Sequence, residues 1–151
     1  MNEESAKRVH LPSERKSVTH KFTLIGADHV VEHDADGKLV EKVADIDGYL
    51  TAGVYDDGRL GEIFLSLGKH GGPWKVFECL MVAVSIGLQY GIPLDVFIDK
   101  FEHMSFEPSG VTRNPEIPMV KSIPDYIFRW LKTRFPGGIS TDMSEEKDGA
   151  S

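Results

Sequence analysis

The stretch that most constrains this chain runs from Phe106 to Pro118 and contains three prolines. Each proline fixes its own φ and lacks a backbone N–H, so the stretch cannot form a helix or a regular strand. Directly after it, Ser122 is a good helix N-cap, and Asp125 three residues later completes a variant of the capping box. The sequence therefore predicts a proline-fixed loop that leads into a capped helix, which ends near residues 135–138.

The first half of the chain alternates apolar and polar residues in short segments, as half-buried strands do. Asp36-Gly37 and Asp57-Gly58 separate such segments and indicate hairpin turns. This half therefore predicts a meander of about four or five antiparallel strands. The expected strands are Val18–Ile25, His29–Glu32, Leu39–Val43, Tyr49–Tyr55 and Glu62–Leu67.

The second half carries helix signals. Pro73 suits a first helical turn and Gly91 suits the position after a helix end, so a first helix is expected over residues 73–90. It is apolar on nearly every side apart from one narrow polar stripe, which is typical of a buried core helix. Further helices are expected over residues 92–104 and from Ser122 onward. Strands followed by helices indicate an α+β fold, in which an antiparallel sheet carries three helices on one face.

Composition excludes several classes of protein. A formal charge of −7 gives no general attraction to nucleic acid, and the longest apolar run, Cys79–Val84, is too short to cross a membrane. The single cysteine excludes an intrachain disulfide framework and, with no signal-peptide pattern, indicates a cytoplasmic protein. We expect one α+β domain over residues 17–135, a flexible N-terminal arm over 1–16 and a disordered acidic tail over 136–151.

One candidate ligand site precedes the first helix, where backbone N–H groups can hold an anion such as a nucleotide phosphate. Its residues are Lys69, His70, Gly71 and Gly72. The spacing does not match a phosphate loop ending in Gly-Lys-Ser/Thr, and a turn that needs glycine conformations is the alternative. Cys79 lies in an apolar run and is expected to be buried as a small hydrophobic residue. The histidines lack metal-ligand spacing, so no metal site is expected.

The proline-rich loop is a candidate for partner docking, because long ordered loops often carry function. The alternative is an ordered surface loop with no function of its own. No nucleophile–base pair in it has the spacing of a known catalytic site, so no catalytic residue is assigned. The candidate partner-binding residues are Phe106, Glu107, Ser109, Arg113, Asn114 and Glu116.

Several motifs between Leu11 and Leu131 resemble, in the same order, the C-terminal region of adenosylcobalamin-dependent (class II) ribonucleotide reductases. The matching stretches are Leu11–Phe22, Gly48–Tyr55, Gly61–Phe64, Ala83–Leu94 and Phe106–Leu131. That region is a TSCPD domain, named after a Thr-Ser-Cys-Pro-Asp signature, which corresponds here to Lys121-Ser122-Ile123-Pro124-Asp125. Ile123 replaces the signature cysteine, which shifts the expectation from thiol chemistry toward recognition. The hairpin over residues 26–47 is an addition to the family pattern.

Such reductases use a barrel, adenosylcobalamin, an active-site thiyl radical and a reducing cysteine pair, which a chain with one cysteine cannot supply. The resemblance therefore implies an accessory, non-catalytic domain that binds no cofactor itself. It would dock on a separate class II reductase catalytic subunit, which holds the adenosylcobalamin, and so support ribonucleotide reduction. Two alternatives remain open. One is a protein that binds a nucleotide or another small anion, and the other is a structural module that forms a homodimer through exposed apolar faces.

Overall fold

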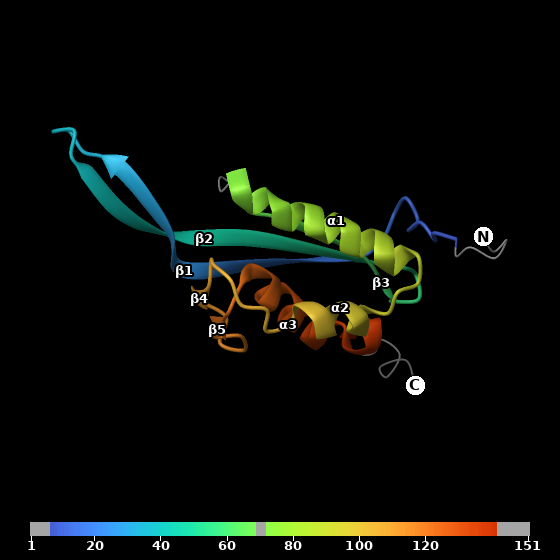
Figure 1. The fold of residues 1–151 in the computed structure, drawn as a ribbon. Coiled ribbons are helices and arrows are strands. Elements are labelled where there is room, and N and C mark those ends of the chain that lie inside the picture. The colour runs from blue at the N-terminus through green and yellow to red at the C-terminus, as the bar shows by residue number, and fades with distance from the viewer. Residues whose placement is uncertain (1–6, 69–71, 142–151) are drawn as a thin grey trace, which may run out of the picture.

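The computed structural model describes residues 7–68 and 72–141, and its strands and helices form the α+β fold that the sequence predicts (Figure 1). The long strands come first: β1 (Ser17–His33), β2 (Leu39–Val54) and β3 (Leu60–Ser66). The 3-10 turn η1 (Gly72–Trp74), α1 (Lys75–Gln89) and α2 (Leu94–Phe101) follow. The chain then forms β4 (Gly110–Val111), β5 (Met119–Val120), α3 (Ile123–Arg134) and the 3-10 turn η2 (Pro136–Gly138).

β1, β2 and β3 form one antiparallel sheet with β2 in the middle. The predicted strands Val18–Ile25 and His29–Glu32 form the single strand β1. The register shifts between Leu24 and Asp28, and the strand continues past this bulge. Gly26 lies there with a φ of 61°, in the left-handed region that glycine adopts readily. Both Asp-Gly pairs lie in hairpin turns, as predicted. In these turns the carboxylates of Asp34 and Asp57 accept hydrogen bonds from backbone N–H groups.

Beyond the bulge, β1 and β2 project past the rest of the sheet as a two-stranded ribbon, here called the hairpin extension (residues 28–44) (Figure 1). Three of its aliphatic side chains are largely exposed: Val31 at 64%, Leu39 at 67% and Val43 at 58%. A two-stranded ribbon buries little apolar surface by itself. The hairpin extension therefore contributes little to the core.

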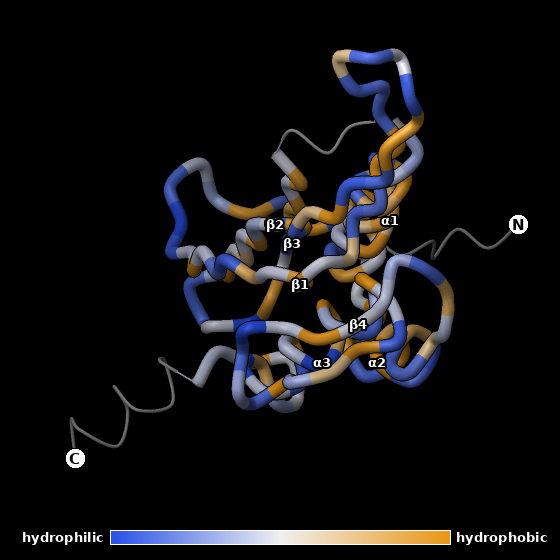
Figure 2. The backbone as a smooth tube through the Cα atoms, turned by 90° about the vertical axis from the view of Figure 1, so that its left-hand side faces the viewer, coloured by the Kyte–Doolittle hydropathy of each residue, from blue (hydrophilic) through white to orange (hydrophobic). Residues whose placement is uncertain are grey.

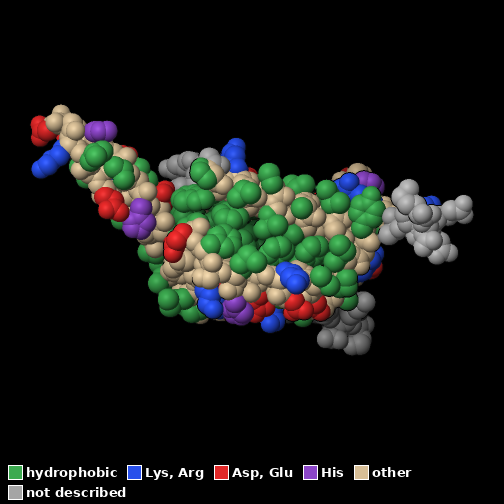
Figure 3. All heavy atoms as spheres, in the orientation of Figure 1, with side chains coloured by type: hydrophobic (Ala, Val, Ile, Leu, Met, Phe, Trp, Pro, Cys, Tyr) green, Lys and Arg blue, Asp and Glu red, His purple; other side chains and the backbone are tan. Residues whose placement is uncertain are grey.

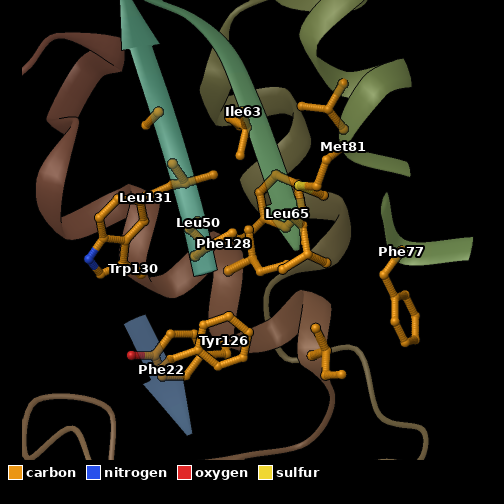
Figure 4. Close-up of a cluster of buried hydrophobic side chains, with 14 of the residues drawn as sticks. Phe22, Leu50, Ile63, Leu65, Phe77, Met81, Tyr126, Phe128, Trp130 and Leu131 are labelled. Atoms are coloured by element: carbon orange, nitrogen blue, oxygen red, sulfur yellow. The ribbon is translucent and has the colours of Figure 1, made fainter. Parts of the chain in front are cut away.

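The helices share one core with the inward side of the sheet; α2 packs on α3, while α1 lies apart from them along β3 (Figure 2). Inward side chains of the strands alternate with outward ones and meet the helices in one core. On the opposite face of the sheet, Tyr49 and Phe64 are exposed. Figure 4 shows the centre of the core, in which the labelled residues are Phe22, Leu50, Ile63, Leu65, Phe77, Met81, Tyr126, Phe128, Trp130 and Leu131.

The prediction that α1 is a buried core helix is wrong, because part of its polar stripe faces the sheet and an apolar stripe faces outward. β3 is an edge strand, and its outward N–H and C=O groups need partners. The Ser85 hydroxyl accepts a hydrogen bond from the Ile63 N–H at 2.8 Å, and Gln89 Nε2 donates to the Gly61 carbonyl at 3.0 Å. These contacts cover the sheet edge with the polar side of α1. Cys79 is consequently exposed, not buried as predicted.

Both ends of the described chain contact the domain. In the predicted N-terminal arm, the Val9 N–H donates to the Gln89 carbonyl at 2.9 Å. The Arg15 guanidinium meets the Glu62 carboxylate at 2.5 Å and 2.9 Å. At the other end, the Ser140 N–H donates to the Gly58 carbonyl at 2.9 Å. Residues 8–16 and 136–140 therefore lie against the sheet and its turns.

The proline-rich loop is irregular, as predicted, apart from the short pair of strands β4 and β5. One isolated bridge, between Leu24 and Thr112, joins the chain after β4 to the outer edge of β1. The helix signal after the loop is confirmed, because the Ser122 hydroxyl accepts a hydrogen bond from the Asp125 N–H at 3.1 Å. The loop and α3 are thereby placed on either side of the β1 edge.

Candidate functional site

A groove of about 640 Å³ runs along the outer edge of β1. Four consecutive residues of β1, His20 to Thr23, line it. Neighbouring side chains of a strand point to opposite faces, so a lining of consecutive residues shows that the groove follows the strand edge itself. The remaining lining residues are Asp45 and Asp47 of β2, Arg113, Asn114, Glu116 and Ile117 of the proline-rich loop, and Trp130, Thr133 and Arg134 of α3. The groove is therefore bounded by four segments of the chain: β1, β2, the proline-rich loop and α3.

A hydrogen-bond network lies against the groove. Tyr126 Oη is 2.7 Å from His20 Nε2 and accepts a hydrogen bond from Asn114 Nδ2 at 3.1 Å. If the buried Tyr126 hydroxyl donates to His20 Nε2, the imidazole is neutral and carries its proton on Nδ1. Burial, and secondarily Arg134, lowers the pKa of His20, while burial raises the pKa of Tyr126. The Trp130 ring stacks on His20 with centroids 4.9 Å apart.

The charged side chains around the groove balance in sign. Arg113 Nη2 lies 3.0 Å from Asp45 Oδ2, and Thr23 donates to Asp47 at 2.6 Å. A hydrogen bond from the Gly26 N–H, supported by Arg113, lowers the pKa of Asp45. A groove with equal numbers of cations and carboxylates gives little electrostatic preference for a polyanion. The charged residues are Lys21, Arg113, Arg134, Asp45, Asp47 and Glu116.

The second candidate surface is the outward side of α1, here called the outer face of α1. Its residues are Val76, Cys79, Val82, Ala83, Ile86 and Tyr90. Val76 is 60% and Val82 is 49% exposed. Figure 3 shows hydrophobic side chains gathered over α1 and continuing toward α2 on this side of the molecule. A contiguous exposed apolar patch is typical of an interaction surface.

The structure separates the predicted partner-binding residues into three groups. Arg113, Asn114 and Glu116 lie together at the groove. Phe106 lies instead beside the N-terminal end of α1, where its ring stacks on Phe77 with centroids 5.8 Å apart. Phe77 is buried on the core side of α1, so Phe106 packs at the rim of the core and not on the outer face of α1.

Glu107 and Ser109 belong to neither surface and contact each other. The Ser109 hydroxyl donates to Glu107 Oε1 at 2.9 Å, and the Ser109 N–H donates to Oε2 at 3.1 Å. Both hydrogen bonds are exposed. These two side chains close a local turn.

The predicted anion site falls mostly outside the described residues. Lys69, His70 and Gly71 are not among them, and Gly72 is the first residue of η1. In residues 7–68 and 72–141, no three His, Cys, Asp or Glu side chains group as metal ligands. None of the helices in those ranges combines the length and apolar composition needed to cross a membrane.

Sequence reasoning missed the groove residues His20, Lys21 and Trp130, and it missed the outer face of α1. The outer face had a signal in the sequence. Ser85 and Gln89 lie four residues apart, on the side of the helix that also carries the buried Met81. Polar residues at that spacing can serve an exposed strand edge. The groove had no comparable signal, because its walls meet only in the folded chain.

Fold and surfaces together define a small α+β domain with a grooved sheet edge and an uncovered apolar helix face. Residues 7–135 match the family model of the TSCPD domain, and the chain belongs to this family. The signature segment that ends at Asp125 lies within this match, and the match confirms the resemblance found in the sequence.

The relatives are much longer proteins, named vitamin B12-dependent ribonucleotide reductase. The protein of Rhodopirellula baltica is 39% identical over 145 residues, which are 95% of this chain and 12% of that protein. The protein of Streptantibioticus cattleyicolor is 40% identical over 129 residues, 85% of this chain and 18% of that protein. That of Bradyrhizobium diazoefficiens is 48% identical over 89 residues, 58% of this chain and 7% of that protein. No solved structure matches the chain.

The chain thus spans less than a fifth of each of these relatives, which is consistent with the C-terminal TSCPD domain of such a reductase. Their name implies a vitamin B12 cofactor. The edge groove has the volume of a site for a drug-sized ligand, and adenosylcobalamin is much larger. The described residues therefore do not fit this cofactor.

Proposed function

We propose that this chain is an accessory domain that docks on the catalytic part of a vitamin B12-dependent ribonucleotide reductase and supports ribonucleotide reduction without performing the chemistry. The relatives that carry the domain within a longer reductase chain support this proposal. In them the catalytic part and the TSCPD region belong to one polypeptide, so an apolar surface of the TSCPD region can pack on the catalytic part of the same chain.

The observation that carries the proposal is the outer face of α1. A helix at the surface of an isolated domain normally turns its apolar side inward and its polar side to water. In α1 the buried Ser85 and Gln89 face the sheet, while Val76, Val82 and Ile86 face outward. This arrangement leaves apolar surface that association with a partner would bury.

The test is a binding measurement between this chain and the Rhodopirellula baltica reductase from which the matching region has been removed. The host's own reductase, where one is identified, serves equally. We expect a stable complex by light scattering, and we expect Val82→Glu to abolish it, because a charge would be buried in the interface. Phe64→Glu is the matched control, since Phe64 is 48% exposed on the helix-free face of the sheet. This variant should bind as the native chain does.

Two results would contradict the proposal. In one, neither reductase forms a complex with the native chain. In the other, Val82→Glu and Phe64→Glu bind equally well. A homodimer in light scattering that Val82→Glu converts to a monomer would assign the outer face of α1 to a second copy of the chain instead.

A further inference from the structure

We propose that the open edge of β1 binds an extended polypeptide segment, which adds to the sheet as a further strand and occupies the edge groove. The inference rests on the proposed function, because we assign this segment to the catalytic part of the reductase. It concerns a surface separate from the outer face of α1.

The direction of the backbone groups along β1 shows which of them are available. The Thr23 carbonyl accepts a hydrogen bond from the Arg113 N–H at 3.3 Å, so Thr23 points its backbone groups away from β2. Successive residues of a strand alternate in this direction, so Lys21 and Thr19 point the same way. The other edge of the sheet supports this assignment. Carried across β2 to β3, the same alternation points the backbone groups of Ile63 and Gly61 outward to α1, where Ser85 and Gln89 bind them.

The outward groups of Thr19 and Lys21 have no backbone partner in the part of the chain that the structure describes. The bridge between Leu24 and Thr112 covers the edge at one end, and the loop then leaves β1 after Arg113. Toward the N-terminus, the N–H and C=O groups of Thr19 and Lys21 have no backbone hydrogen bond on the outward side in residues 7–68 and 72–141. An added strand would lie beside β1 in the same position as Thr112, but farther toward the N-terminus of β1. Unpaired edges of this kind are the template for strand addition.

The walls of the groove suit an extended peptide better than a nucleotide. Alternate side chains of an added strand would point to opposite faces of the sheet. One set would meet His20, Trp130 and Ile117, and the other set would meet Lys21 and Asp47. The equal numbers of cations and carboxylates suit an uncharged polypeptide main chain and give little net attraction to a nucleoside di- or triphosphate.

The test uses isotope-labelled full chain and overlapping peptides of roughly ten residues, the upper length of an ordinary strand, drawn from the catalytic part of the Rhodopirellula baltica reductase. In the free chain we expect the amides of Thr19 and Lys21 to exchange fast, because they point outward. Those of His20 and Phe22 should exchange slowly, because they bond to β2. A binding peptide should slow the exchange of Thr19 and Lys21 by about tenfold or more.

Two substitutions at one position separate the strand edge from the side chain. Lys21→Pro removes the outward N–H without touching the β1–β2 ladder, and prolines are tolerated on strand edges. We expect it to weaken peptide binding by about tenfold or more, because one main-chain hydrogen bond is lost and the ring hinders the added strand. Lys21→Ala keeps the N–H and loses only a side-chain contact with the groove occupant, so it should weaken peptide binding clearly less than Lys21→Pro does. Thr19→Pro tests the same edge independently if Lys21→Pro unfolds.

The outcomes separate this inference from the proposed function. If the catalytic part binds but no peptide protects Thr19 and Lys21, the inference is wrong and the proposed function stands. Equal binding by both proline variants and the native chain would also overturn it. If the catalytic part fails to bind, the proposed function is wrong, and the assignment of the segment to the reductase is lost with it.

Discussion

The buried carboxylate of Asp125 accepts a hydrogen bond from the His103 N–H, with 2.7 Å between Oδ1 and N. His103 follows the end of α2 and has a φ of 66°, a left-handed conformation that is costly for residues other than glycine. The second carboxylate oxygen accepts from the Lys121 N–H at 2.8 Å. Asp125, the last residue of the signature segment, therefore ties the start of α3 to the end of α2 and to the residue after β5.

Substituting Asp125→Ala should lower the free energy of unfolding by about 2–4 kcal/mol, because two backbone N–H groups lose their acceptor at once. Urea unfolding followed by circular dichroism measures this. Asp99→Ala is the control, since Asp99 is exposed on α2, and it should change the stability by less than about 0.5 kcal/mol. Equal effects of the two substitutions would show that Asp125 has no special structural role.

The signature cysteine position is occupied by Ile123, which is fully buried, while the chain's own Cys79 is exposed. We expect native protein to react with a thiol reagent at Cys79 without unfolding. Ile123→Cys should add a thiol that reacts only on unfolding, and should cost about 1–2 kcal/mol for the lost apolar volume. Rapid reaction of both thiols in the folded variant would contradict the burial of this position.

The two cysteine positions also show what the sequence could and could not predict. The presence of the helices, the Ser122 cap and the hairpin turns follow from local rules, and the structure confirms them, although α2 (Leu94–Phe101) is shorter than the predicted 92–104. The side of α1 that faces the core depends on a tertiary fact, namely that the β3 edge requires polar partners. An apolar run around Cys79 therefore indicated burial, and the exposed edge overrode it.

The junction between the proline-rich loop and α3 shows the same limit at the candidate site. Arg113, Asn114 and Glu116 were named as candidates from the loop alone, and all three lie at the groove. His20 and Trp130 were not named, because nothing local in β1 or α3 indicates that they stack on each other. Spatial partners more than a hundred residues apart leave no periodic signal.

Lowering the pH should decrease the free energy of unfolding, because His20 titrates differently in the folded and unfolded chain. Its pKa is lowered by burial and by Arg134 from an ordinary value of 6.5. As the pH falls through 6.5, the unfolded chain takes up a proton that the folded chain does not, so the free energy of unfolding decreases down to the folded-state pKa. His20→Gln keeps an acceptor for Tyr126 without titrating, and its stability should depend less on pH in this window.

A nuclear magnetic resonance titration of the His20 ring checks the cause directly. The midpoint should lie below 6.5 in the native chain and should rise in Arg134→Gln, because one source of repulsion is removed. A midpoint at or above 6.5 in the native chain would contradict both the buried environment of His20 and the hydrogen bond from Tyr126.

The hairpin extension should be removable without unfolding the domain. Leu24 and Ile46 are direct cross-strand partners, so an Asn-Gly turn in place of residues 25–45 closes the hairpin in a favoured two-residue loop. The deletion removes no side chain of the fully buried core, and the ion pair that it breaks between Arg113 and Asp45 is exposed and contributes about 0–1 kcal/mol. We therefore expect Tm to change by no more than about 4 °C in a calorimetric scan.

A fall in Tm of more than about 10 °C would show instead that the hairpin extension is part of the cooperative unit. If the shortened chain stays folded, the same binding measurement with the reductase tests whether the exposed Val31, Leu39 and Val43 serve a partner. Weaker binding by a folded, shortened chain would assign them to the interface. Unchanged binding would show that the outer face of α1 suffices for docking.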